Sequence, residues 1–420
     1  MLAGSDMILA EGQYFSTDDY QTKRNNNVLA VGAPGSGKTA SIVVPNLLQA
    51  NDSYIVSDPK GRLYRQYARY FKGKGYNVKL LDFTHPERSS HYNPFAYIHT
   101  TKDVIKMANS LAFQKDMTSF SKDPFWDYAA FLLYCAVIAY LSFECPERMR
   151  TIQNMVSLIL MCQVTDDNEK SNALDKIMQR LKEKKPESFA VRQYEKFRMS
   201  PGRTMQSILI TANSKLATFD FPELNIMTAV DDIHLVEAGK RKMVVFVVVS
   251  DTDRSMDGIS NLFFEQALQE LCNYADNKCS DGRLPIAVRF ILDDFATNVK
   301  INEFPRIVSC IRSRGISAMM MIQSEAQLQA AYGEDGQTII SSADTYLYLG
   351  GNDLQTAQAV AMRGDISLDK ILSLPIGECI IFRRGSRPVQ ARTFRLDEHR
   401  DYFQVKENSK SPMIKHSFFR

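Results

Sequence analysis

The feature that most constrains this chain is the glycine-rich run at residues 32–39, which matches the pattern G-x-x-x-x-G-K-[ST]. In this pattern, glycines let successive backbone N–H groups turn inward around phosphates, the lysine reaches their oxygens, and the final hydroxyl can bind Mg²⁺. A β-like run, Val28–Val31, precedes it and a helix-compatible run, Ala40–Leu48, follows it, as such a loop requires. The alternative is a glycine-rich turn with a stray lysine. We predict a nucleotide-binding loop formed by Gly32, Ala33, Pro34, Gly35, Ser36, Gly37, Lys38 and Thr39.

A second segment supplies the carboxylates that nucleotide chemistry needs. The apolar run 286–292 ends directly in Asp293 and Asp294, and α/β sheets place their ligand sites at the carboxyl ends of strands. This is the form of a Walker B segment. We predict that Asp293 and Thr39 hold Mg²⁺ and that Asp294 orients or deprotonates the attacking water. The alternative is a pair of aspartates that only cap a helix.

Two further candidates follow the carboxylates. Arg312 lies eighteen residues after Asp294 and shortly before the apolar run 316–322. The segment between the two strands returns to the opposite edge of a parallel sheet, so Arg312 would serve a neighbouring subunit as an arginine finger, with Arg314 as a competing candidate. Gln323 ends the next strand, where it could sense the γ-phosphate or be an ordinary polar strand end. The predicted catalytic residues are Lys38, Asp294, Arg312 and Gln323.

The order of apolar runs predicts the fold. Short continuous runs occur at 28–31, 54–56, 78–83, 243–249, 286–292, 316–322 and 346–349, separated by helical segments, which indicates a mostly parallel sheet buried on both faces. A hairpin is expected from 379–382 and 389–394. Residues 1–27 look like an irregular polar lead-in. We predict a discontinuous α/β domain at 1–99 and 219–400, an inserted all-α domain at 100–218, and a tail at 401–420.

Composition limits the functional classes. The net charge is only +3, so affinity for nucleic acid must come from local patches. Seven cysteines without a C-x-x-C pair argue against a disulfide framework and favour a reducing, cytosolic setting. The most apolar stretch, 129–143, is shorter than the roughly 20 residues of a spanning helix. We therefore expect it to be a buried helix in a chain that is itself soluble.

Two stretches are rich in basic residues. Between Lys60 and Lys79 there are seven basic and no acidic residues, interleaved with aromatic ones. A DNA-binding face and a plain solvated helix face both remain open for this stretch. The second stretch, Lys176 to Arg203, has nine basic residues against three glutamates, and we interpret it as a solvated face. The candidate DNA contacts are Lys60, Arg62, Arg65, Arg69 and Lys72.

Several of these motifs together resemble one family. The chain is similar to the VirD4/TraG family of type IV secretion coupling proteins, of the kind found on Gram-positive conjugative elements. The likeness covers about residues 20–395. Besides the phosphate loop, it rests on residues 25–29 (NNNVL), 45–46 (PN), 57–61 with 63–64 (SDPKG, LY), 92–95 (YNPF), 291–295 (ILDDF), 322–324 with 327–328 (IQS, QL), 348–351 (YLGG) and 356–357 (TA).

The resemblance implies a RecA-like P-loop ATPase that uses ATP and Mg²⁺, assembles as a homo-hexamer, and couples single-stranded DNA carried by a relaxase to a type IV secretion channel. It also implies work at the cytoplasmic face of the membrane. Family members usually carry N-terminal membrane helices, so we expect either a soluble portion or a separate anchor protein. Two departures stand out: Asp294 occupies a position where glutamate is common, and so does Arg62.

Three functions remain open on this evidence. The first is an ATP-driven DNA translocase. The second is a nucleotide-gated adaptor that docks its substrate with little hydrolysis, because Asp294 is one methylene shorter than glutamate and a misplacement of about 1 Å can cost on the order of 10²-fold in rate. The third, a small-molecule P-loop kinase, fits poorly with a helical insertion of this length and with the basic stretches.

Overall fold

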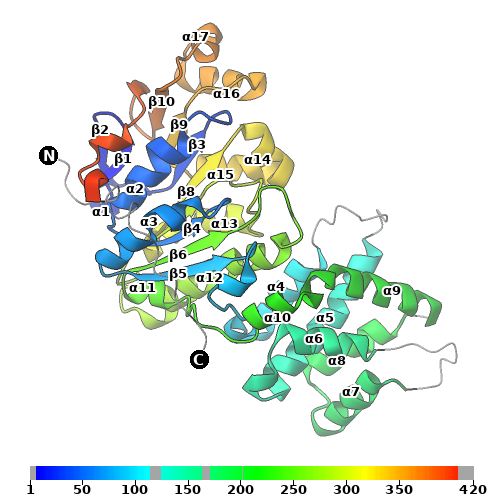
Figure 1. Cartoon of the computed structure of the whole chain (residues 1–420). Coiled ribbons are helices and arrows are strands. Elements are labelled where there is room, and N and C mark those ends of the chain that lie inside the picture. Colours follow the sequence, from blue (N-terminus) through cyan, green and yellow to red (C-terminus); the bar gives the residue numbers. More distant parts are fainter. Residues whose placement is uncertain (1–5, 114–123, 163–170, 201, 405–420) are drawn as a thin grey trace. The chain divides into compact units, whose positions relative to one another are not determined.

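The computed structural model describes residues 6–113, 124–162, 171–200 and 202–404 (Figure 1). The chain forms two compact units. Unit 1 comprises residues 1–82, 235–252 and 268–420, and unit 2 comprises residues 83–234 and 253–267. Most of the predicted tail, from residue 405 onwards, lies outside the described residues.

Unit 1 is built on a nine-stranded sheet. Seven neighbouring strands are parallel, and the antiparallel hairpin β10–β11 extends one edge. The predicted parallel sheet and the predicted hairpin are both confirmed. In spatial order the strands are β11 (Val389–Arg392), β10 (Glu378–Arg383), β9 (Thr345–Tyr348), β3 (Val28–Val31), β8 (Ile316–Ile322), β7 (Val288–Leu292), β4 (Ser53–Ser57), β6 (Met243–Val248) and β5 (Asn77–Asp82).

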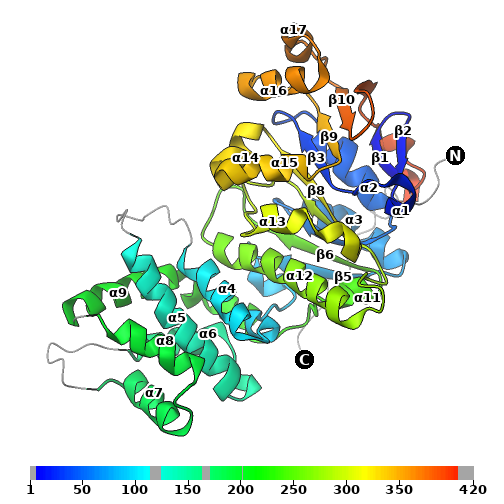
Figure 2. The same ribbon diagram turned by 180° about the vertical axis from the view of Figure 1, so that it is seen from behind.

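Helices cover both faces of this sheet. Figure 1 shows α2 (Val44–Leu48) and α3 (Arg62–Gly73) on one face, and Figure 2 shows α13 (Phe304–Val308) on the other. The central strands β3, β4, β6, β7 and β8 are buried along their whole length, as expected for a sheet covered on both sides. The other helices of unit 1 are α1 (Asp19–Thr22), α11 (Glu237–Lys240), α14 (Glu325–Tyr332), α15 (Gly336–Ser341), α16 (Leu354–Gly364), α17 (Leu368–Leu372) and the second half of α12 (Asp257–Lys278).

The prediction of an irregular N-terminus is wrong. Residues 6–10 and 13–16 form an antiparallel hairpin, β1 (Asp6–Ala10) and β2 (Gln13–Ser16), followed by α1. Met7, Leu9 and Ala10 of β1 are buried in the core cluster that also contains residues of α2 and α3. A four-residue apolar run is too short to be separated from a loop by its sequence pattern, so only the tertiary packing reveals this strand.

The helix predicted after the phosphate loop, with a kink at Pro45, is divided into two parts in the structure. Residues Thr39–Val43 form a π-helical turn and α2 starts only at Val44. Pro45 explains the interruption, because it has no N–H to donate to the preceding turn. The buried side chain of Asn46 donates from Nδ2 to the carbonyl oxygens of Ile42 (2.7 Å) and Ile8 (2.6 Å), which ties this helix to β1.

Unit 2 contains helices and, among its described residues, no strand. Its central helix α5 is hydrophobic and mostly buried. Among the described residues α5 alone is long and apolar enough to cross a membrane by length and composition, and 61% of its apolar window is buried inside the protein. The helices are α4 (Thr101–Ala112), α5 (Phe125–Glu144), α6 (Ile152–Leu160), α7 (Ala173–Lys184), α8 (Phe189–Arg198), α9 (Gly202–Lys215), α10 (Pro222–Met227) and the first half of α12.

This helical unit extends beyond residues 100–218 on both sides. Buried polar contacts explain why: the Tyr92 hydroxyl donates to Gln266 Oε1 (2.5 Å), and Gln266 Nε2 donates to the Pro94 carbonyl (3.0 Å). The Tyr97 hydroxyl likewise donates to Asp231 Oδ2 (2.8 Å). The segments that flank the predicted insertion, together with the first half of α12, therefore pack with the helices.

Candidate active site

The phosphate loop leaves the carboxyl end of β3 and is fixed by the two neighbouring strands. Gly32 N donates to Ile322 O at the end of β8 (3.2 Å), and Ala33 N donates to Gly350 O just after β9 (3.0 Å). Gly35 and Gly37 have φ of +78° and +87°, a region that glycine enters without strain. A Cβ on Gly32 would lie 2.6 Å from Ser36 Oγ. Gly35 and Gly37 are thus required by the backbone conformation, and Gly32 by the close packing of the Ser36 and Leu349 side chains.

Lys38 is buried within this loop, with 7% of its surface exposed. Its Nζ donates to the carbonyl oxygen of Gly32 and to that of Ala33 (3.1 Å). Burial lowers the pKa of Lys38, while the nearby carboxylates of Asp294 and Asp293 oppose that shift. The lysine is therefore held at the centre of the loop and faces both carboxylates.

The two predicted metal-binding residues meet. Thr39 Oγ1 donates to Asp293 Oδ2 at 2.7 Å, although 254 positions separate them in the sequence. Burial raises the pKa of Asp293 to about 6, against the effect of the Thr39 hydrogen bond and with help from the charge of Asp294. An adjacent hydroxyl and carboxylate are the oxygen ligands that Mg²⁺ takes from a protein when phosphates and waters supply the rest. The pair therefore fits Mg²⁺.

Asp294 follows in an unusual backbone conformation, with φ of +51°. Aspartate tolerates this left-handed region better than most residues. The turn is held in place because Asn298 N donates to Asp294 O (3.0 Å) and Phe295 N donates to Met321 O of β8 (2.8 Å). The chain thus turns sharply at the strand end, where it presents two successive carboxylates.

Gln323 lies beside the loop. The residue before it, Ile322, pairs with Val31 in the parallel register of β8 and β3, so Gln323 and Gly32 leave their strands side by side. Its Oε1 accepts a hydrogen bond from Gln327 Nε2 (3.3 Å) and its backbone N donates to Gln327 Oε1 (3.2 Å). Gln327 therefore orients the side chain of Gln323 at the edge where a nucleotide would bind.

Arg312 lies at the amino ends of the parallel strands, on the side of the sheet opposite to the phosphate loop. It belongs to the turn just before β8, a strand of seven residues, and that length separates it from its own phosphate loop by roughly 20 Å. Its guanidinium contacts Asp19, from Nε to Oδ2 (3.3 Å) and from Nη2 to the backbone O (2.8 Å). The competing Arg314 forms a two-bonded ion pair with Asp276, at 2.7 and 2.8 Å.

Lys60 lies in the turn before α3, and the other candidate DNA contacts lie on α3, where Arg69 is half-buried. Lys60, Arg62, Arg65 and Lys72 are exposed, and the opposite face of the helix, with Leu63 and Phe71 among its residues, is buried against the sheet. Lys60 Nζ lies 3.3 Å from Asp251 Oδ2. Asp58, which is 1% exposed, accepts a hydrogen bond from Tyr64 N (2.9 Å) at the start of α3. The basic face is therefore presented on a firmly anchored helix.

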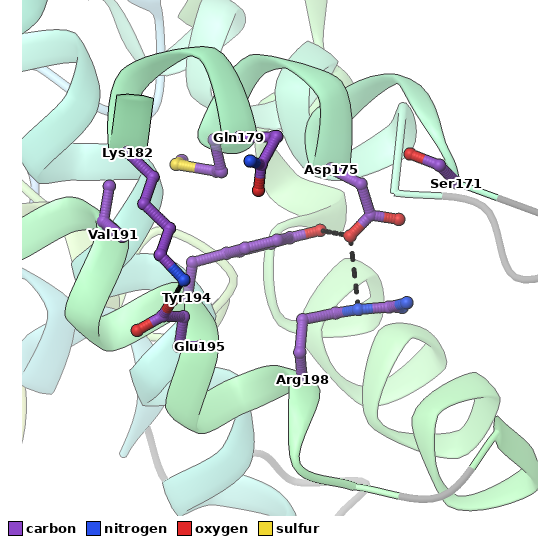
Figure 3. Close-up of a pocket in the computed structure, with 9 residues that line it drawn as sticks. Ser171, Asp175, Gln179, Lys182, Val191, Tyr194, Glu195 and Arg198 are labelled. Atoms are coloured by element: carbon purple, nitrogen blue, oxygen red, sulfur yellow. Dashed lines mark hydrogen bonds and ion pairs between the residues drawn. The ribbon is translucent and has the colours of Figure 1, made fainter. Parts of the chain in front are cut away.

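Several basic side chains of the second basic stretch form ion pairs. In the pocket between α7 and α8, about 260 Å³ in volume, Arg198 Nε lies 3.2 Å from Asp175 Oδ1, which also accepts the Tyr194 hydroxyl (2.9 Å) (Figure 3). Lys182 Nζ lies 2.7 Å from Glu195 Oε1. These pairings favour the interpretation of this stretch as a structural, solvated face.

Sequence reasoning missed Asp19 and Arg283, because residues 1–27 showed no recognisable motif. Arg283 binds the Asp19 carboxylate with two hydrogen bonds, at 2.9 and 3.2 Å, although 264 positions separate the two residues. No local spacing connects residues so far apart in the chain. Only the fold brings them to the edge where Arg312 lies.

Comparisons with known proteins add the family context. A family profile described as "Type IV secretory system Conjugative DNA transfer" matches residues 3–363. No curated protein matches the chain. The solved plasmid coupling protein TrwB, in complex with ADP and Mg²⁺, is similar over 93% of this chain and 89% of its own, with 14% identity and a TM-score of 0.68.

Two other solved structures are similar. The bacterial conjugative coupling protein TrwBdeltaN70 in complex with sulphate matches 92% of this chain and 89% of its own, with 14% identity and a TM-score of 0.67. VirB4 of Thermoanaerobacter pseudethanolicus matches 93% and 97%, with 15% identity and a TM-score of 0.55. These likenesses confirm the predicted RecA-like α/β fold. With the profile over residues 3–363, the chain belongs to the type IV secretory system conjugative DNA transfer family.

Proposed function

We propose that this chain is an ATP-hydrolysing coupling protein that drives single-stranded DNA, delivered by a relaxase, into a type IV secretion channel during conjugation. The observation that carries the proposal is the 2.7 Å contact between Thr39 and Asp293. It joins the phosphate loop to the carboxylate strand within a chain of the conjugative DNA transfer family. A bound sulphate, ADP and Mg²⁺ in the related TrwB structures support an anionic nucleotide ligand with a metal ion.

In this proposal each residue has a defined task. The N–H groups of residues 32–39 surround the phosphates, and Lys38 exchanges its carbonyl partners for phosphate oxygens. Thr39 and Asp293 hold Mg²⁺, which when bound neutralises phosphate charge. Asp294 accepts a proton from the attacking water or orients it. Gln323, beside Gly32, contacts the terminal phosphate and reports its loss.

Arg312 completes the site from a neighbouring subunit. A finger of this kind spreads the charge of the transferring phosphoryl group. The roughly 20 Å length of β8 separates Arg312 from its own loop, whereas head-to-tail contacts in a ring place the two edges of adjacent subunits together. A homo-hexamer satisfies this geometry. Hydrolysis then belongs to the assembly, whose attachment to the cytoplasmic face of the membrane would come from an N-terminal anchor or a separate protein.

The basic face of α3 supplies contacts to the DNA backbone. Exposed arginine and lysine side chains bind phosphates without reading bases. The helical unit, residues 83–234 with 253–267, is proposed to recognise the relaxase, because it lies outside the nucleotide motifs and its surface can vary. Loss of relaxase capture after disruption of this unit, with ATP binding retained, is the expected result. Unchanged capture would assign recognition elsewhere.

The decisive experiment measures ATP hydrolysis with and without single-stranded DNA at two salt concentrations. A DNA-driven motor is stimulated by DNA, and the stimulation falls at the higher salt because backbone contacts release counterions. The short side chain of Asp294 leaves the adaptor as the second candidate function. ATP binding without stimulated hydrolysis would favour the adaptor and overturn the motor.

A further inference from the structure

We propose that Asp19 is a positioning residue for Arg312, which it holds so that one side of the guanidinium stays available to the nucleotide of the neighbouring subunit. This role rests on the proposed function of Arg312 as a finger in trans. It gives the N-terminal segment, which shows no motif of its own, a place in the reaction.

The first support is the way Arg312 is bound. Asp19 contacts its Nε through the carboxylate and its Nη2 through the backbone carbonyl. Within the described part of the chain, Nη1 makes no hydrogen bond, and 39% of the Arg312 side chain is exposed. Asp19 therefore binds the guanidinium along one edge only, through Nε and Nη2. These two hydrogen bonds fix the plane of the guanidinium and leave other N–H donors for phosphate oxygens, which arginine binds in a fixed fork geometry.

The second support is the way Asp19 itself is fixed. Its side chain is 7% exposed, and Arg283 binds both carboxylate oxygens. The side chain of Arg283 packs closely against Gly315, where an added Cβ would lie 3.2 Å from Arg283 Cγ. Because the carboxylate is shared by two arginines, it neutralises Arg312 only in part. A carboxylate paired with Arg312 alone would compete more strongly with a phosphate.

The third support is the surrounding charge. Arg312, Arg283 and Arg289 border one small cavity of about 70 Å³ at the start of β7 and β8, together with Asp19 and Asp52. Arg289 is paired with Asp52 at 3.2 Å, and its buried Nε has no partner within the described residues. Three cations against two anions give the lining of this cavity a net positive charge, which suits the approach of a triphosphate from another subunit.

The test uses mixtures of inactive subunits. The parent mixture combines Lys38→Ala, which keeps its finger but has no working loop, with Arg312→Ala, which keeps its loop but has no finger. Part of the activity is expected to return, because some interfaces then join an intact loop to an intact finger. If subunits exchange and no activity returns, Arg312 does not act in trans, and both the proposed finger and its positioning by Asp19 fall together.

Asp19→Asn is then placed on one partner or the other. On the Lys38→Ala subunit, which donates the finger, it should lower the recovered rate about 10-fold or more, because a small displacement of a catalytic group is costly. On the Arg312→Ala subunit, which donates the loop, it should leave the recovered rate unchanged. Equal loss from both placements, or no loss from either, would overturn the positioning role while the parent mixture still supports the finger.

Two controls keep the result readable. The first control is Asp18→Asn. Asp18 caps the same short helix, and its side chain accepts hydrogen bonds from Tyr20 N and Gln21 N. The recovered rate should not depend on which subunit carries this change. If the D19N subunit does not fold, the experiment uses Arg283→Gln instead. This variant removes the guanidinium that fixes the Asp19 carboxylate. The same dependence on placement is then expected, and its absence overturns the proposal.

Discussion

The carboxyl ends and the amino ends of the parallel strands, here called the carboxyl edge and the amino edge of the sheet, differ in how their functional residues are brought together. At the carboxyl edge, the phosphate loop, Asp293 and Gln323 each follow a strand directly, so strand geometry brings them together. At the amino edge, Asp19, Arg283 and Arg312 come from three distant segments, and both arginines form ion pairs with the buried carboxylate of Asp19. The difference shows that sequence motifs locate residues that follow strands directly, such as Asp293 and Gln323, and miss residues such as Asp19 and Arg283 that only the fold brings together.

The largest expected effect separates the two arginines at the amino edge. Arg312→Ala should reduce hydrolysis by about 10³-fold or more, as loss of an arginine finger does. The matched control, Arg314→Ala, removes the ion pair with Asp276 and the hydrogen bond from Nη1 to the Cys310 carbonyl oxygen, and should change the rate less than tenfold. Steady-state ATPase rates measure both. If Arg314→Ala has the larger effect, Arg314 is the finger.

The next effect tests the division of labour at the carboxyl edge. Asp294→Asn keeps the shape but cannot accept a proton, so hydrolysis should fall by about 10²- to 10⁴-fold with ATP affinity near normal. Asp293→Ala should instead weaken ATP binding in the presence of Mg²⁺, because its carboxylate meets Thr39 at the predicted metal site. Nucleotide titrations beside rate measurements separate the two. Normal turnover by Asp294→Asn would contradict its assignment.

The buried His399, which belongs to neither candidate site, should make the protein less stable in acid. Burial lowers the pKa of His399 to about 4, below its usual value near 6.5. The unfolded chain therefore binds this proton more readily, so the stability from the neutral ring is present above about pH 6.5 and is lost as the pH falls towards 4. The expected loss between pH 7 and 5 is up to about 2 kcal/mol. Denaturant titrations of His399→Leu should show a smaller loss, and an unchanged pH dependence would contradict this.

The smallest effect concerns the basic face of α3. If Arg65 and Arg69 each contact one phosphate, replacing both with alanine should flatten the log–log salt dependence of single-stranded DNA binding by about 1.4. Arg180 and Lys184 have the same spacing on α7 and serve as the control pair, with no change expected. Binding titrations at several salt concentrations measure the slope. An unchanged slope for the α3 variant would make that face an ordinary solvated surface.

The sequence predicted what local patterns determine. The strand at 316–322 was placed at its observed bounds, because continuous apolar runs in a covered sheet are distinctive. The hairpin at residues 6–16 was missed because its apolar run is short. The role of Asp19, in α1, was missed because its ion-pair partners lie hundreds of positions away. The π-helical turn before Pro45 was missed too, because the proline pattern indicates an interruption without specifying its form.

The most direct test of a shared catalytic centre is the rate of ATP hydrolysis per subunit as a function of protein concentration, with the mass of the assembly followed by sedimentation. Almost no hydrolysis is expected from the unassembled chain, and the rate per subunit should rise in parallel with the fraction in rings, because each loop then meets the Arg312 of its neighbour. A dispersed subunit that hydrolyses ATP as fast as the assembled one would contradict this expectation.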